Sequence, residues 1–446
     1  MKETLLFSNR SLLQLFYPIV LEQLLIIFAG FTDSIMVASL GEAAVSGVSM
    51  IDNIVVLLIL VFTALASGGA VLMGQYLGRG DLSQAQESGR QTVWISALLS
   101  LVLMAAFYGA RTLIFTDLYG GTEPDVMRSA TEYFNVIGLS IPFVALNQAG
   151  SAIFRTAGNT KFPMLVVLGA DIFNVFGNYT AIFILRWGVT GTAISTLLSR
   201  IISAAVVLYV AQHANFSLRL PNIFRGKLEK SLIYRILQVG IPFSIENGLF
   251  QLGKIVVYSV VTGFGTSAIA AYAVGTTLTG FQALPGVAMN TGSTTVISRC
   301  LGAGKIEQSR YYTKKIILWI MAADLGATIL LFMLWPGFLR IYDFPAATMD
   351  LVFQTLLWHG VLEVLIWPLT FTLPVVFRSA GDARFAMIVG VISMMTIRVG
   401  GAYVLCGPLH CGMMGAWYAM FLDWVVRAMI YVPHYLNRSY LRHKLI

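Results

Sequence analysis

Long apolar stretches alternate with short polar segments along the whole chain. Each of twelve stretches holds about 20 or more mostly apolar residues, the length that an α-helix needs to cross a bilayer. They fall at 12–37, 48–73, 92–112, 127–151, 163–185, 188–211, 234–261, 268–298, 313–340, 350–375, 385–406 and 411–433. They lack the polar–apolar alternation that is typical of transmembrane strands. Because a backbone inside a bilayer must satisfy its own hydrogen bonds, the pattern predicts twelve transmembrane helices.

The composition supports a membrane protein. Of the 446 residues, 57% are hydrophobic and 11% are charged, with a mean hydropathy of +0.78. Soluble proteins carry about 25% charged residues. A surface facing water cannot be built from so few charges, which excludes a soluble enzyme, a disordered protein and a nucleic-acid binder.

The basic residues are unevenly distributed among the loops. Of the 29 Lys and Arg residues, 21 lie at the two ends of the chain and in the loops on the same side, against 4 in the opposite loops. Cytoplasmic loops are enriched in Lys and Arg, so we expect both termini in the cytoplasm and the protein in the plasma (inner) membrane. The net charge of +8 is thus explained by topology, without a nucleic-acid partner.

The chain repeats itself at about half its length. At an offset of 224 residues Pro18 matches Pro242, and at 223 the segment 154–158 matches 377–381. An even number of helices in each half inserts both halves in the same direction, and such repeats are related by an axis along the membrane normal. We therefore predict an all-α integral membrane fold with two six-helix bundles related by a pseudo-twofold axis. The predicted lobes are residues 1–211 and 234–446, joined by a basic linker at 212–233.

Paired loop motifs carry a resemblance to a known family. Glycine-rich loops occupy 74–81 and 298–305, and Phe-Arg-(Thr/Ser)-Ala-Gly recurs at 154–158 and 377–381. Together with Pro18 and the Asp-Ser-Ile-Met run at 33–36, these loops resemble MATE (multidrug and toxic compound extrusion) transporters. The resemblance implies a secondary active antiporter that exports amphipathic, often cationic, organic compounds against entry of protons or sodium ions. We expect a monomer without a cofactor.

Polar residues within the predicted spans are candidates for the coupling site, because charge in the bilayer is costly. Asp171, Asn174 and Asn178 share one face of the fifth predicted helix. The resemblance implies a cation pocket formed by residues of three helices. They are Asp33 of the first helix, Asn174 and Asn178 of the fifth, and Thr196 of the sixth. Many family members have Asp where this chain has Asn178, and Asp171, one turn away, could supply the missing carboxylate. The only metal expected is therefore Na⁺ at this set, with H⁺ as the alternative.

The second half does not repeat this set. At the repeat offsets, Asp33 corresponds to Val257, and Asn174 and Asn178 correspond to Ile397 and Gly401. A shared packing role would have left similar residues in both halves, so the asymmetry favours a function for Asp33. A carboxylate with little solvation favours its protonated form, which suits proton coupling. Protonation would relieve the buried charge and let the first helix repack, with Pro18 as its weak point because proline lacks a backbone donor.

Further polar residues within the spans are candidates for substrate contact: Glu22, Gln23, Glu246 and Asn247. Lys254 could pair with Glu246 or Glu363, and Arg398 with Asp324. Arg398 and Asp324 could be an internal ion pair or part of a site.

Two rival functions differ in the chemistry that they need. A lipid-linked saccharide flippase of the same superfamily would need a strongly cationic cavity for pyrophosphate, whereas acids are prominent here. An intramembrane enzyme would need a metal triad or a nucleophile–base pair, and neither is visible. We therefore expect a transporter and no enzyme.

Overall fold

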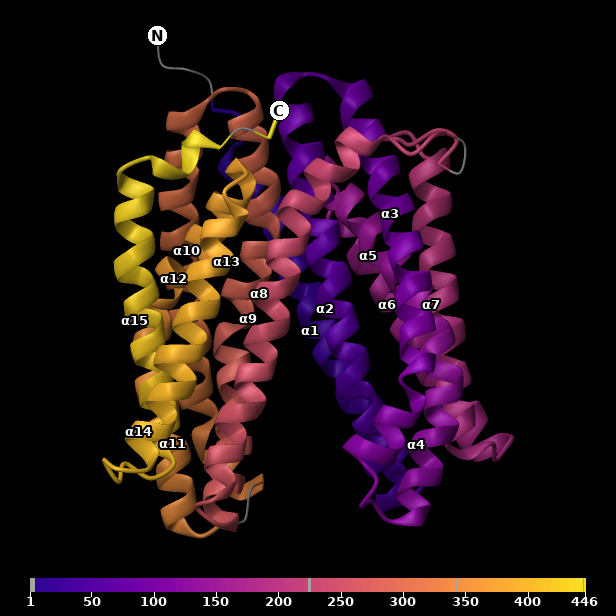
Figure 1. Ribbon diagram of the computed structural model, residues 1–446, viewed down its shortest axis with the longest axis vertical. Helices are drawn as coiled ribbons and strands as arrows, with labels where there is room; N and C mark the ends of the chain where they lie inside the picture. The colour runs from indigo at the N-terminus through magenta and orange to yellow at the C-terminus, as the bar shows by residue number, and fades with distance from the viewer. Residues whose placement is uncertain (1–4, 224–225, 342–343, 444) are drawn as a thin grey trace. The chain divides into compact units, whose positions relative to one another are not determined.

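The computed structural model describes residues 5–223, 226–341, 344–443 and 445–446, and every regular element in them is a helix (Figure 1). Within this part of the chain the helices group into twelve spans, so the predicted all-helical membrane fold is confirmed.

The first half contains six spans. Three of them are the single helices α1 (Asn9–Ala38), α2 (Glu42–Arg79) and α3 (Leu82–Gly109). The π-helical segment η1 (Leu113–Leu118) follows α3. The remaining spans are α4 (Pro124–Ile137) with η2 (Gly138–Ser140) and α5 (Ile141–Ala157), α6 (Lys161–Tyr179) with the π-helical η3 (Thr180–Ile184), and α7 (Gly188–His213).

The second half repeats this order. It begins with α8 (Lys230–Thr262), α9 (Thr266–Gly302) and α10 (Ile306–Ile341). A bend of 44° separates α11 (Ala346–Leu365) from α12 (Trp367–Ala380). The last spans are α13 (Ala383–Ser393) with the π-helical η4 (Met394–Gly400) and α14 (Gly401–Cys406), and α15 (Met414–Leu436), which the short η5 (Ser439–Arg442) follows.

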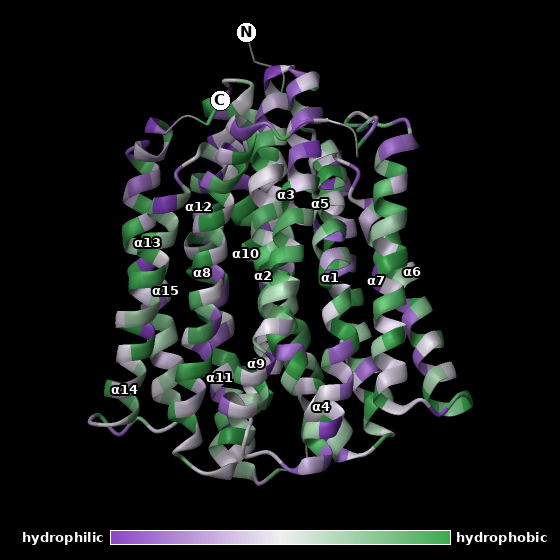
Figure 2. Ribbon diagram, turned by 45° about the vertical axis from the view of Figure 1, so that its right-hand side comes forward, coloured by the Kyte–Doolittle hydropathy of each residue, from purple (hydrophilic) through white to green (hydrophobic). Residues whose placement is uncertain are grey.

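The spans differ in how apolar they are. Eight helices of the described chain are long and apolar enough to cross a membrane by themselves, or nine if the bent pair α11–α12 forms one span. Hydrophobic residues run along most of their length (Figure 2). The other long helices, α8, α9 and α15, carry charged side chains or many Ser, Thr and Gly residues, which lowers their hydropathy.

The chain divides into two compact units. One contains Asn9–Ser244, and the other contains Met1–Ser8 with Ile245–Ile446. The boundary therefore lies inside α8, two residues after Pro242, whereas the sequence prediction put a linker at 212–233. The start of the chain belongs to the second unit: the backbone N–H of Phe7 donates to the hydroxyl of Tyr312, which in turn donates to the carbonyl of Phe7.

The motif glycines end helices at corresponding positions in both halves. Gly158 follows α5 with a φ of 91° and Gly381 follows α12 with a φ of 98°. This left-handed conformation is strained for residues with a Cβ atom, and glycine adopts it freely. The Phe-Arg-(Thr/Ser)-Ala-Gly motifs thus end the helices that carry Arg155 and Arg378 in their last turns.

The core of the first unit is built around α2. An apolar cluster joins α2 to α3, α4 and α5, and in it the rings of Phe107 and Phe134 stack at 4.3 Å. Gly68 lets α8 approach closely, because a Cβ atom there would lie 2.5 Å from the carbonyl oxygen of Ile236. This scaffold fixes the helices that surround the polar site.

Candidate functional site

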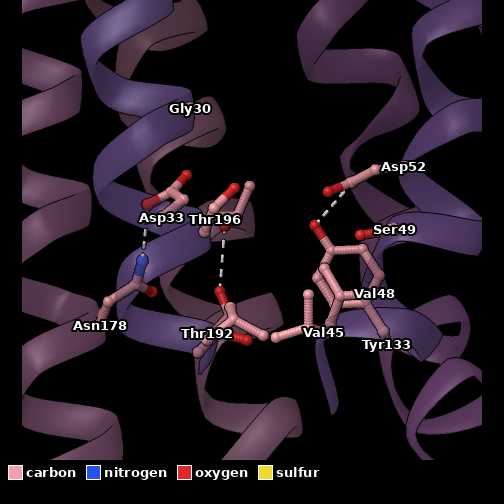
Figure 3. A pocket seen from close by; sticks show the side chains of 12 residues that line it. Gly30, Asp33, Val45, Val48, Ser49, Asp52, Tyr133, Asn178, Thr192 and Thr196 are labelled. Atoms are coloured by element: carbon pink, nitrogen blue, oxygen red, sulfur yellow. Dashed lines mark hydrogen bonds between the residues drawn. The ribbon is translucent and has the colours of Figure 1, made fainter. Parts of the chain in front are cut away.

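A polar cavity of about 220 Å³ lies within the first unit (Figure 3). Its walls come from five helices, namely α1, α2, α4, α6 and α7. The lining residues are Gly30, Asp33, Ser34, Val37, Val45, Val48, Ser49, Asp52, Tyr133, Asn178, Thr192 and Thr196. One wall carries three of the predicted coupling residues, Asp33, Asn178 and Thr196, and the other carries a second carboxylate.

A chain of hydrogen bonds links the four residues that the resemblance singled out. The Nδ2 atom of Asn178 donates to Oδ1 of Asp33 at 2.9 Å and to Oδ1 of Asn174 at 3.1 Å. Asn174 donates from Nδ2 to Oγ1 of Thr196 at 3.1 Å. The hydroxyl of Thr196 donates to the carbonyl of Thr192 at 3.0 Å. The structure therefore brings Asp33, Asn174, Asn178 and Thr196 together.

Both asparagines are buried, whereas Asp33 is half-buried at the cavity wall. The Oδ1 atom of Asn178 has no hydrogen-bond partner among the described residues. It is the type of neutral oxygen that coordinates small cations. Asp33 thus offers a carboxylate and Asn178 an uncommitted carbonyl oxygen on the same side of the cavity.

A second carboxylate, Asp52 of α2, lines the opposite wall (Figure 3). The hydroxyl of Tyr133 in α4 donates to its Oδ1 atom at 2.9 Å. Asp33 and Asp52 are close enough to repel each other, and Arg200 of α7 attracts both. The position of Arg200 is fixed by a hydrogen bond of 2.7 Å to the hydroxyl of Ser140. The cavity therefore has two acids and one nearby guanidinium.

Asp171 lies on α6 outside the set that lines the cavity. It interacts electrostatically with Asp33, and its Oδ2 atom is buried without a hydrogen-bond partner among the described residues. Within the cavity itself, the second carboxylate comes from Asp52. Asp52 was not among the predicted site residues, although it is an ionisable residue inside the second apolar stretch, the property that identified Asp33.

Two of the proposed substrate residues form ion pairs with the motif arginines. Glu22 of α1 pairs with Arg155 at the end of α5. At the corresponding positions of the second half, Glu246 of α8 pairs with Arg378 at the end of α12, at 3.3 Å. Glu22 is buried, and both pairs lie mostly out of solvent. These contacts tie each proline-containing helix to the last turn of a helix that ends at a motif glycine.

The remaining candidates have fewer contacts. Gln23 and Asn247 are half-buried, and their side chains form no hydrogen bond within the described ranges. Pro18 lies inside α1, which continues as a helix on both sides of it. No group of three or more His, Cys, Asp or Glu residues in the described chain could hold a metal ion.

The second unit has a separate set of buried polar contacts. His359 in α11 lies 2.8 Å from Oε1 of Gln282 and 3.6 Å from Glu363. Asp324 accepts a hydrogen bond from the backbone of Gly286 at 3.0 Å. Within the described residues, Glu246 pairs with Arg378 instead of Lys254, and no ion pair joins Lys254 to Glu363 or Arg398 to Asp324.

The chain matches the MatE family model twice, over residues 18–180 and 242–404. The two matches begin 224 residues apart at Pro18 and Pro242, which confirms the internal repeat.

Two relatives match over nearly their full length. The uncharacterized transporter YisQ of Bacillus subtilis is 25% identical over 97% of this chain and 95% of its own. The probable multidrug resistance protein NorM of Thermotoga maritima is 24% identical over 96% of this chain and 92% of its own.

Solved structures agree in fold. A MATE protein in the bent conformation matches with a TM-score of 0.89 and 19% identity, over 97% of this chain and 96% of that one. An outward-facing multidrug resistance MATE transporter gives the same values.

Proposed function

Because this chain belongs to the MatE family of membrane transporters, we propose that it is a cation-coupled antiporter that exports amphipathic organic compounds by alternating access. The coupling ion is H⁺ or Na⁺, and Asp33 is its binding group. The observation that carries the proposal is the position of Asp33 in a polar cavity, hydrogen-bonded to Asn178 on a neighbouring helix.

Cation binding at Asp33 would alter its contact with Asn178, because it withdraws negative charge from the carboxylate that accepts this hydrogen bond. In the structure the amide of Asn178 donates to Oδ1 of Asp33. A proton or a sodium ion on the carboxylate weakens this acceptor and thereby favours a different arrangement of Asn178. Since Asn178 is also bonded to Asn174, and Asn174 to Thr196, the change reaches α7 through two further hydrogen bonds. Cation binding to α1 thereby acts on α6 and α7.

The neighbouring charges set the affinity of the cavity for a cation. Repulsion between Asp33 and Asp52 favours uptake of one positive charge, because a proton or an ion shared near two carboxylates relieves that repulsion. Arg200 opposes uptake, and the Tyr133 hydroxyl stabilises charged Asp52. With two acids against one guanidinium, the empty cavity has one negative charge in excess, which a monovalent cation would neutralise.

Movement of α1 couples the cavity to the rest of the first unit. Pro18 interrupts the backbone hydrogen bonds of α1 one turn before Glu22, which is tied to Arg155. The part of α1 beyond Pro18 carries Gly30, Asp33 and Ser34 into the cavity wall. Bending at Pro18 would open or close that wall while the start of the helix stays in place.

We further propose that the protein acts as a monomer in the plasma (inner) membrane with both termini in the cytoplasm. The excess of Lys and Arg in the terminal segments and the loops on their side supports this orientation. We propose no enzymatic activity and no cofactor.

The test compares the variants Asp33→Asn and Asp125→Asn with the native protein in cells and in everted vesicles. Asp125 is an exposed acid at the start of α4, so its variant controls for the substitution itself. We expect Asp33→Asn to abolish rhodamine B efflux at an unchanged amount of protein in the membrane, while Asp125→Asn keeps it. A pH gradient and a sodium gradient, imposed separately on the vesicles, identify the coupling ion. Full efflux by Asp33→Asn, or efflux that responds to neither gradient, contradicts the proposal.

A further inference from the structure

Three cationic side chains in the second unit gather around one aromatic ring. The Nζ atom of Lys254 lies 5.2 Å from the ring centroid of Phe250, and the Cζ atoms of Arg398 and Arg427 lie 5.2 Å and 5.4 Å from it. We call Lys254, Arg398 and Arg427 the basic cluster. Its members come from α8, η4 and α15 respectively. An aromatic ring attracts cations but cannot neutralise their charge.

The basic cluster has fewer acids than cations. Asp423 accepts a hydrogen bond at 2.9 Å from Nε of Arg427 and another at 2.5 Å from the hydroxyl of Ser393. Within the described part of the unit, no other carboxylate forms an ion pair or hydrogen bond with the cluster. Guanidinium groups stay protonated in proteins. The two arginines therefore exceed the one carboxylate by a full positive charge, even before Lys254 is counted.

Donors of the basic cluster are buried without acceptors. Arg398 is 5% exposed and its Nε atom has no hydrogen-bond partner among the described residues. Arg427 is 2% exposed, and its Nη2 atom likewise has no partner there. A buried charged donor without an acceptor is destabilising. The Oδ2 atom of Asp423 also has no hydrogen-bond partner among the described residues. One carboxylate balances only one of the three cations, which leaves room for an acceptor from outside the chain. Lys254, the third member of the cluster, is exposed.

Positions related by the internal repeat carry different charges in the two halves. At an offset of 224 residues Lys254 corresponds to Gly30, which lines the cavity of the first unit, and at 223 Asp423 corresponds to Arg200. One half thus surrounds an arginine with acids, whereas the other surrounds an acid with bases. A purely structural ion pair would not need two surplus cations beside it.

We propose that the basic cluster binds the anionic group, a carboxylate or a phosphate, of the transported compound, while Phe250 packs against its apolar part. Paired guanidinium groups match the planar, bidentate geometry of these anions. The inference deepens the proposed antiport function, on which it rests, by naming the substrate class. The substrates are amphipathic compounds with an acidic group, organic anions or zwitterions, in preference to compounds with only positive charge.

Binding of rhodamine B and of its ethyl ester tests this preference. The two dyes share one ring system and differ in whether the carboxyl group is free. Fluorescence polarisation with the purified protein in detergent gives both Kd values. A charge-assisted hydrogen bond contributes enough for about a tenfold difference in affinity. We expect the native protein to bind rhodamine B about tenfold more tightly than the ester, and Arg398→Gln to lose this preference.

Arg384→Gln is the matched control. Arg384 is an exposed arginine on α13, within the span that contains η4, and it should leave the preference unchanged. Equal affinity of the native protein for both dyes overturns the proposal, and so does a full preference in folded Arg398→Gln. If Arg398→Gln elutes as an aggregate, Lys254→Gln decides the question, because an exposed side chain can be replaced without a cavity. An undiminished preference in Lys254→Gln then overturns the proposal.

Two further arms separate the sources of the anion and the two proposals. In the first arm, phosphatidylglycerol and phosphatidylcholine compete with rhodamine B for binding. Displacement by phosphatidylglycerol alone would assign the anionic group to a lipid. Displacement by neither lipid assigns it to a soluble compound. Asp33→Asn is expected to lose efflux and keep the dye preference. A variant that loses efflux but keeps the dye preference therefore reports on the proposed antiport alone. A variant that loses the dye preference but keeps efflux reports on the basic cluster alone.

Discussion

The amide of Asn178 in α6 donates a hydrogen bond of 2.9 Å to the carboxylate of Asp33 in α1. In the proposed function, this contact makes Asn178 the residue that responds when Asp33 binds a cation. An amide can donate as well as coordinate, so it can stabilise charged Asp33 before the cation arrives.

Asn178→Asp tests this role directly. The substitution replaces the donor with a second carboxylate at hydrogen-bond distance from Asp33, and two such carboxylates hold a shared cation more tightly. We expect the half-saturating Na⁺ concentration for efflux to fall about tenfold, or the half-saturating pH to rise by about one unit. Efflux from vesicles at stepped ion concentrations measures both. An unchanged dependence on both ions would show that Asn178 is not part of the cation site.

Tyr133→Phe removes the hydrogen bond to Asp52 and leaves the ring in the apolar cluster. Charged Asp52 then loses a donor, which favours proton uptake by the two acids of the cavity. The pH at which efflux is half-maximal should therefore move upward, while the protein remains as stable as the native form. The pH profile of efflux provides the measurement. Tyr234→Phe, at an exposed position on α8, should behave like the native protein, and an identical shift in both variants would contradict the role of Tyr133.

The ion pair of Glu246 with Arg378 should be structural. Its side chains are 14% and 9% exposed, so Glu246→Gln leaves a guanidinium charge that water screens poorly. We expect a loss of about 3 kcal/mol in the free energy of unfolding. The double variant with Arg378→Gln should lose less than the sum of the two single variants, since the residues interact.

A thermal unfolding series in detergent measures this coupling. Glu307→Gln is the control, because its pair with Arg438 is 70% and 51% exposed and should change the free energy of unfolding by less than about 1 kcal/mol. Equal losses from the buried and the exposed pair would show that burial does not strengthen the contact. A strict sum in the double variant would show that the two side chains act independently.

Gly68→Ala should destabilise the first unit. The added Cβ atom would lie 2.5 Å from the Ile236 carbonyl, so α2 and α8 must separate, at a cost of about 1–3 kcal/mol. Gly109→Ala is the matched change in α3, where no atom lies within 4 Å of the new Cβ. Thermal unfolding of the two variants is expected to show a lower midpoint for Gly68→Ala alone. Similar midpoints would mean that the helices do not need this close approach.

Sequence reasoning grouped Asp33, Asn174, Asn178 and Thr196 correctly in space. Helical periodicity places two of them on one face of the fifth span, and the family resemblance supplied the other two helices. Binding of a cation there stays a prediction. Periodicity does not give the rotation of α2 against α1, and therefore did not show that Asp52 faces the same cavity.

For the same reason, the ion-pair partners of Glu22 and Glu246 could not be predicted from the sequence. Each follows a proline by four residues, and the sequence alone did not show that Arg155 and Arg378 point back toward these helices. The motifs at 154–158 and 377–381, which the sequence indicates as helix ends followed by turns, also contain the arginine that pairs with each acid. Prediction of ion pairs between distant residues requires knowledge of how the helices pack. Prediction of the spans requires only the hydropathy of the sequence.

The division of the chain makes the first six spans an insertion within the second unit. The backbone crosses between the units after Ser8, whose neighbour Phe7 is bonded to Tyr312, and again after Ser244. A unit attached at both of its ends cannot move by bending a single linker. Its motion must deform the backbone at two crossings together, and at the second one Pro242 has already removed a hydrogen bond from the helix.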